Sequence, residues 1–201
     1  MNLANKLTIF RIILVPIMVI IPYLGIEGEF LNIPITYWII NLIFCIASIT
    51  DKLDGYIARS RNQVTTFGKF LDPIADKILV LAAMVMLVGF DNKIPSWIPI
   101  IVLFREFIVS GYRLIAVEKG GKVIAASVWG KLKTVTQMIA LILAFIDIHK
   151  FGEFIFNPIE GNFWLVLNVI STVIMFVSVI ATIFSGWEYI KNGKELFKDS
   201  M

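Results

Sequence analysis

The sequence predicts an all-α membrane protein with six transmembrane helices, preceded by a short interfacial helix at the N-terminus. Of its 201 residues, 58% are apolar and only 16% are charged, which is typical of a chain that crosses a membrane several times. The apolar residues form six runs, each near the roughly 20 residues that a helix needs to span a bilayer. Positive residues concentrate in alternate connections between these runs. These patterns indicate a single polytopic domain over residues 1–201 rather than a water-soluble protein.

The six apolar runs place the expected spans at about 8–24, 36–58, 67–90, 96–117, 131–148 and 162–184. Lysines and arginines are frequent near both ends of the chain and in the connections after the second and fourth spans. The opposite connections contain only Lys93 and Lys150 as basic residues. Because positively charged loops remain in the cytoplasm, both termini are expected on the cytoplasmic side of the cell membrane.

The first residues combine an apolar face with a polar one. The apolar side of residues 3–10 predicts an interfacial helix before the first span. Asn5, Thr8 and Arg11 recur every third residue and so roughly share a second face. They form either a polar edge, with the arginine extending to the lipid headgroups, or a set of donors for a phosphate. The spacing alone leaves both interpretations open.

Four aspartates flank the connection between the second and third spans. Asp51 and Asp54 are three residues apart, and Asp72 and Asp76 are four apart, so each pair shares a helical face. In two antiparallel neighbouring helices, the four carboxylates would lie close together. Such a cluster is costly to dehydrate unless hard cations neutralise it, and oxygen ligands favour Mg²⁺ or Mn²⁺. Four carboxylates suffice for two ions about 4 Å apart, the arrangement of two-metal phosphoryl chemistry.

The residues between the two aspartate pairs carry a resemblance to a known family. The spacing D-x2-D-G-x2-A-R-x8-G-x3-D-x3-D resembles the signature of the CDP-alcohol phosphotransferase family at every fixed position. Two other interpretations are carboxylates paired with Arg59, Arg61, Lys69 and Lys77, and a pathway for divalent cations. A cation pathway does not explain the glycines and the arginine between the pairs.

The resemblance implies a role for each matching residue. The general base would be Asp76, and two divalent ions would be held by Asp51, Asp54, Asp72 and Asp76. The CDP-linked lipid would be bound by Gly55, Ala58, Arg59 and Gly68, and by a similar N-x2-T-x2-R pattern at Asn5, Thr8 and Arg11.

The fourth and fifth spans contain further charges. Arg105 and Arg113 lie too far inside an apolar run to belong to the surface, and Lys131 and Lys133 open the next span. Two arginines with one or two lysines are what an acceptor carrying its own phosphate requires. The alternatives are a buried ion pair between Arg105 and Glu106, and lysines attracted to anionic lipid.

The segments R-E-F-x-V-x-G-x-R and G-K-x-K-T resemble, within the family, the members that use sn-glycerol 3-phosphate. The resemblance implies transfer of a phosphatidyl group from CDP-diacylglycerol to glycerol 3-phosphate, with release of CMP. Inositol phosphate, serine and phosphatidylglycerol are alternative acceptors, and a divalent-cation transporter is the alternative class. We also expect contact with membrane lipids, a homodimer, and no nucleic-acid partner.

Overall fold

The computed structural model describes residues 3–60, 66–90, 92–118 and 127–197. Within these ranges, the side chains of residues 3–4, 52–60, 66–67, 69–70, 117–118 and 192–197 lie outside the description. The elements in chain order are α1 (Leu3–Ile20), η1 (Ile21–Leu24), β1 (Glu29–Phe30), β2 (Ile33–Pro34), α2 (Ile35–Ser60), α3 (Thr66–Gly89), α4 (Trp97–Glu118), α5 (Val128–Ile146), α6 (Glu153–Phe156) and α7 (Asn162–Phe197).

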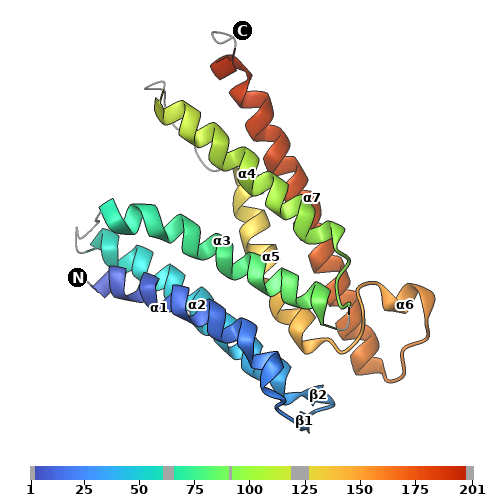
Figure 1. Ribbon diagram of the computed structural model, residues 1–201. Coiled ribbons are helices and arrows are strands. Elements are labelled where there is room, and N and C mark those ends of the chain that lie inside the picture. Colours follow the sequence, from blue (N-terminus) through green and yellow to red (C-terminus); the bar gives the residue numbers. More distant parts are fainter. Residues whose placement is uncertain (1–2, 61–65, 91, 119–126, 198–201) are drawn as a thin grey trace.

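The six long helices form a bundle in which α5 joins two groups (Figure 1). α1 packs against α2 and α3, while α4 packs against α7. α5 contacts α2 and α3 on one side and makes its most extensive contact with α7. The short antiparallel pair β1–β2 and helix α6 lie at one end of the bundle, away from the first residues of α1 (Figure 1).

Every expected span corresponds to one long helix, but two ends differ from the prediction. α1 runs without a break from Leu3, so the structure does not separate an interfacial helix from the first span. α7 contains 36 residues and continues to Phe197, beyond the expected end at 184. By length and composition alone, three described segments suit a membrane span: Asn5–Leu24, Val128–Ile146 and Asn162–Lys191.

The remaining long helices contain charged residues that explain why they are less apolar. α3 and α4 have 24 and 22 residues, which is long enough to span. α3 carries its charged residues in its first half, at Lys69, Asp72, Asp76 and Lys77, whereas α4 carries them from its middle to its end, at Arg105, Glu106, Arg113 and Glu118. Four of these charges, Asp72, Asp76, Arg105 and Arg113, are candidate site residues, so the site itself reduces the hydropathy of the helices that hold it.

The interior and the exterior of the bundle are both apolar. Phe44, Leu79 and Leu141 are fully buried and belong to one core between the helices. In contrast, Phe104 and Phe107 on α4 are each 68% exposed. Large apolar side chains around the outside suit a surface that faces lipid rather than water. The chain is therefore a helical membrane protein.

A polar cluster closes the end of the bundle that carries α6. The Lys93 ammonium donates to the backbone oxygens of Asp147 (2.5 Å) and Ala144 (3.4 Å) at the end of α5. Asn168 of α7 donates to the Asp147 carboxylate at 2.8 Å. The cluster connects α5, α7 and the residues before α4, so we interpret it as structural.

Candidate active site

The aspartates lie on adjacent helices, as expected from their spacing. Asp51 and Asp54 belong to α2, Asp72 and Asp76 belong to α3, and the two helices pack together. Asp51, Asp72 and Asp76 are half-buried. Gly68 is buried near the start of α3. Some predicted site residues have side chains outside the described ones, namely Asp54, Gly55, Ala58 and Arg59.

α1 holds two of the aspartates in place. The Thr8 hydroxyl donates to Oδ1 of Asp72 at 2.7 Å. Nη1 of Arg11 lies 2.8 Å from Oδ1 of Asp51, and its Nε donates to the backbone oxygen of Ala47 at 3.3 Å. Arg11 is fully buried, so it points into the protein and does not extend to the lipid headgroups. Its guanidinium compensates the charge of a half-buried carboxylate.

A polar cavity of about 310 Å³ lies between α3, α4, α5 and α7. Asp76 lines it from α3, Arg105 and Arg113 from α4, and Lys133 from α5. The structure thus brings together the predicted base and three of the four predicted acceptor-binding residues. The fourth, Lys131, is exposed and does not line this cavity.

Two polar side chains of α7 orient the arginines. The Arg105 guanidinium donates through Nη2 to the Ser185 hydroxyl at 2.5 Å. The Arg113 guanidinium donates through its own Nη2 to the Tyr189 hydroxyl at 3.0 Å. Ser185 and Tyr189 are four residues apart and share a helical face, just as Arg105 and Arg113 do at a separation of eight. α7 therefore orients both guanidinium groups, but Arg113 is exposed, so the expectation that it lies away from the surface is wrong, whereas Arg105 is half-buried.

Glycines leave the space that Arg105 occupies. A Cβ at Gly186 would lie 3.3 Å from Cγ of Arg105. A Cβ at Gly130 would lie 3.5 Å from its Nη2. The arginine therefore passes between α5 and α7 at points where neither helix has a side chain.

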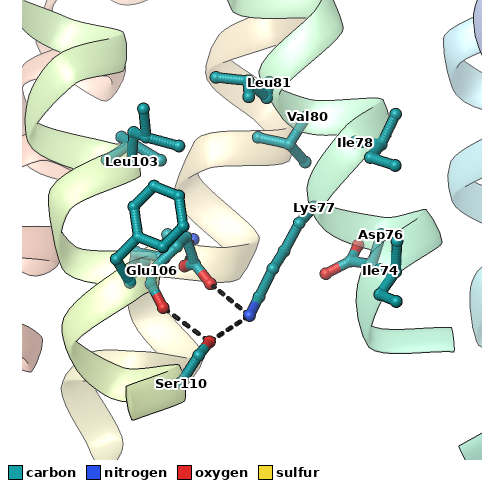
Figure 2. A pocket seen from close by; sticks show the side chains of 12 residues that line it. Ile74, Asp76, Lys77, Ile78, Val80, Leu81, Leu103, Glu106 and Ser110 are labelled. Atoms are coloured by element: carbon teal, nitrogen blue, oxygen red, sulfur yellow. Dashed lines mark hydrogen bonds and ion pairs between the residues drawn. The ribbon is translucent and has the colours of Figure 1, made fainter. Parts of the chain in front are cut away.

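A second cavity, also about 310 Å³, adjoins the first and is mainly apolar (Figure 2). It lies between α3 and α4, where Leu81 and Leu103 contribute to its walls. Both cavities are lined by Asp76, Lys77, Glu106, Ser110 and Lys133. The predicted base therefore lies where a polar space meets an apolar one.

Comparison with known proteins assigns this arrangement to a family. A model of the CDP-alcohol phosphatidyltransferase family matches residues 1–184. The chain belongs to that family. It is 42% identical to the CDP-diacylglycerol–glycerol-3-phosphate 3-phosphatidyltransferase of Bacillus subtilis, over 99% of this chain and 98% of the relative.

Other similar proteins come from distant bacteria. The Haemophilus influenzae enzyme of the same name is 38% identical, over 100% of this chain and 97% of the relative. A protein of Mycobacterium tuberculosis named probable phosphatidylglycerophosphate synthase is 35% identical, over 94% of this chain and 80% of the relative. The resemblance found in the aspartate motif therefore extends along the whole chain.

CDP-alcohol phosphatidyltransferases generally depend on divalent metal ions. Among the described side chains, no three from His, Cys, Asp and Glu lie close enough together to hold a metal. The family pattern also implies Asp54 as a metal ligand, but its side chain is not among the described ones. The donors that are described, Asp51, Asp72 and Asp76, are all carboxylates, which fits a hard cation. A carboxylate bonded through one oxygen retains a second oxygen for an ion.

The structure adds residues that sequence reasoning did not place in the site. Lys77 donates to the Ser110 hydroxyl across the space between α3 and α4 (Figure 2). Glu106 accepts from Lys133 at 2.7 Å and from Arg105 at 2.9 Å. The ion pair between Arg105 and Glu106, given above as an alternative, is therefore present within a larger cluster, while Arg105 also lines the cavity. The sequence offered signals for Glu106, which is adjacent to Arg105, and for Lys77, which is adjacent to Asp76, but none for the contacts of either residue with the other helices.

Proposed function

We propose that this protein transfers the phosphatidyl group of CDP-diacylglycerol to sn-glycerol 3-phosphate, giving phosphatidylglycerophosphate and CMP. The observation that carries the proposal is the shared cavity of Asp76, Arg105, Arg113 and Lys133. One cavity thus contains a carboxylate that can activate the acceptor's hydroxyl and cations that can bind its phosphate. The names of similar proteins in three bacteria agree with this reaction.

The cavity suits a small acceptor with a phosphate. Its volume of about 310 Å³ lies at the lower end of the range for ligand sites, about 300–1,000 Å³. Arg105 and Arg113 offer planar groups that can donate two hydrogen bonds each to phosphate oxygens, and Lys133 adds a point charge. Lys131 remains a predicted phosphate-binding residue, although Lys133 is the lysine that lines the cavity.

The reaction needs a base because an alcohol is a weak nucleophile at neutral pH. In our proposal, the Asp76 carboxylate accepts the proton of the acceptor's C1 hydroxyl. The hydroxyl oxygen forms a bond to the phosphorus that carries the diacylglycerol, and the bond from that phosphorus to the CMP oxygen breaks. CMP leaves with the electron pair, and the proton remains on Asp76 until it passes to solvent. No covalent enzyme intermediate is required.

The donor would be bound by the aspartate motif and α1. Bound divalent ions, two in our proposal, would supply positive charge to the pyrophosphate and to the departing CMP. Thr8 and Arg11 orient Asp72 and Asp51, and Asn5 lies buried on the same helix. Gly55, Ala58, Arg59 and Gly68 would contact the cytidine nucleotide. The diacyl chains would remain in the lipid.

The membrane arrangement is part of the proposal. We propose six spans, with both termini and the site on the cytoplasmic side, because basic residues concentrate at that end. The water-soluble acceptor and CMP would then exchange with the cytoplasm. A homodimer in the cytoplasmic membrane remains a prediction.

The first prediction separates an enzyme from a transporter. Purified protein in liposomes is expected to release CMP from CDP-diacylglycerol only when glycerol 3-phosphate is added. The same liposomes are expected to take up no labelled Mn²⁺ beyond protein-free controls. Metal uptake without CMP release would instead support a cation pathway lined by the aspartates.

The second prediction concerns the acceptor phosphate. Arg113→Ala is expected to raise the KM for glycerol 3-phosphate by at least about tenfold, because a lost charge-assisted contact costs about 1.5–3 kcal/mol. The KM for CDP-diacylglycerol should change little, since that site lies on α2 and α3. Saturation curves for each substrate, with wild type and variant, measure both values.

Lys191→Ala provides a matched control for Arg113→Ala. Lys191 is an exposed cation on α7, two residues beyond Tyr189, and does not line the cavity. Its removal should leave both KM values unchanged. If Arg113→Ala moved the two KM values together, the arginine would be structural or would bind the lipid donor.

A further inference from the structure

Glu106 is the point where cations from three helices meet. Its Oε1 accepts from Lys133 of α5 at 2.7 Å and from its neighbour Arg105 at 2.9 Å. Its Oε2 lies 3.8 Å from the Lys77 ammonium of α3. The Glu106 side chain is 17% exposed, and it lines both the polar and the apolar cavity. Glu106 thus connects the helix of the base to the helices of the acceptor-binding residues.

Lys77 has a second bond that strengthens this connection. Its ammonium donates to the Ser110 hydroxyl, and that hydroxyl donates to the backbone oxygen of Glu106 at 2.7 Å (Figure 2). Lys77 follows Asp76 directly in the chain. The contact of Lys77 with α4 therefore holds α3 to α4 one residue away from the predicted base.

The cations need a counter-charge in this setting. Four cations and two carboxylates line the polar cavity, and three of the cations contact Glu106. Without it, these like charges would repel each other inside the protein, and the most buried of the cations, Lys133, would lose its ion-pair partner. Long lysine and arginine side chains would then adopt several rotamers, and this disorder would have to be removed when an acceptor binds.

We propose that Glu106 is a positioning residue for the acceptor: it holds Lys133 and Arg105 in the arrangement that a phosphate requires. Glu106 does not itself bind the acceptor, because a carboxylate repels a phosphate. The inference rests on the proposed function and adds to it the group that arranges the cations before the acceptor arrives.

The sign of the effect distinguishes positioning from simple electrostatics. Glu106→Gln removes one negative charge from an anion-binding cavity while keeping the size of the side chain. If charge alone mattered, the variant would bind glycerol 3-phosphate more tightly. If Glu106 positions the cations, the variant binds it more weakly, because an amide oxygen is a poorer acceptor for two cations than a carboxylate.

The test is the split between the KM values of the two substrates. Glu106→Gln is expected to raise the KM for glycerol 3-phosphate about 10- to 100-fold, with little change in the KM for CDP-diacylglycerol. Glu106→Asp keeps the charge on a shorter side chain, and its KM should lie between those of Glu106→Gln and wild type. Glu160→Gln, at an exposed position before α7, serves as the control and should match wild type.

A double variant supplies the second measurement. Because Glu106 acts in part through Lys133, Glu106→Gln combined with Lys133→Met should raise the acceptor KM by clearly less than the product of the two single factors. Additive effects would overturn the proposal, as would an unchanged or lowered acceptor KM in Glu106→Gln. Should Glu106→Gln fail to fold, Glu106→Asp decides alone: an unchanged acceptor KM overturns the proposal. A wild type that does not use glycerol 3-phosphate would refute the proposed function instead.

Discussion

Asp76→Asn is expected to lower kcat by about 10²–10⁴-fold, the usual contribution of a general base. Asparagine has nearly the size of aspartate but cannot accept the proton of the acceptor hydroxyl. Asp76 is half-buried and lines the cavity that holds Arg105, Arg113 and Lys133, so the substitution should disturb neither donor nor acceptor binding strongly. Single-turnover rates, measured with both substrates saturating, give the size of the chemical effect.

Asp76 is also a predicted metal ligand, so the two roles need separation. The loss of turnover in Asp76→Asn should persist at metal concentrations far above those that saturate the wild type. A variant whose rate returns to wild type at high Mg²⁺ would have lost a ligand and not a base. A near wild-type rate at ordinary Mg²⁺ would remove Asp76 from the mechanism altogether.

Removal of divalent metal is expected to abolish turnover, and Mg²⁺ or Mn²⁺ should restore it. The described donors are carboxylates alone, and the donor lipid carries a pyrophosphate whose charge needs compensation. Asp51→Ala should require a higher metal concentration, because it removes one predicted ligand and leaves the fully buried Arg11 without its carboxylate. Metal titrations of CMP release, after chelation and gel filtration, measure both effects. Full activity in thoroughly stripped protein would contradict a metal-assisted reaction.

The fold was largely predictable because membrane helices have a strong compositional signal. Each of the six apolar runs corresponds to a helix, since a backbone within lipid must satisfy its own hydrogen bonds. Hydropathy predicts where lipid contact ends and not where a helix ends, so α7 can continue beyond the expected end of the last span. The residues from Ser185 onward are more polar but remain helical to Phe197, and Tyr189 packs inside the protein.

The site was predictable where its residues are close in the sequence. The aspartates of one pair share a face by spacing alone, whereas contacts over long separations cannot be read from spacing. Glu106 lies 27 residues from Lys133, and Arg105 lies 80 from Ser185. These contacts depend on how α4, α5 and α7 pack.

The choice between Lys131 and Lys133 illustrates the same difficulty. Two residues apart on a helix, they point about 200° apart, so one lines the cavity and the other is exposed. The buried face of α5 continues through Gln137, Ala140 and Ala144, in register with Lys133. That periodicity was present in the sequence and would have favoured Lys133, although it could not have identified Glu106 as its partner.

In our proposal, this one chain joins the phosphatidyl group of CDP-diacylglycerol to glycerol 3-phosphate. To test this reaction, purified protein is incubated with CDP-diacylglycerol, Mg²⁺ and one acceptor at a time. The acceptors are glycerol 3-phosphate, glycerol, inositol phosphate, serine and phosphatidylglycerol. Mass spectrometry then identifies the lipid formed. We expect phosphatidylglycerophosphate from glycerol 3-phosphate, in amounts equal to the CMP released, and little product from the others. A preferred product from another acceptor would contradict the assigned substrate, and no lipid product from any acceptor would contradict the proposed reaction.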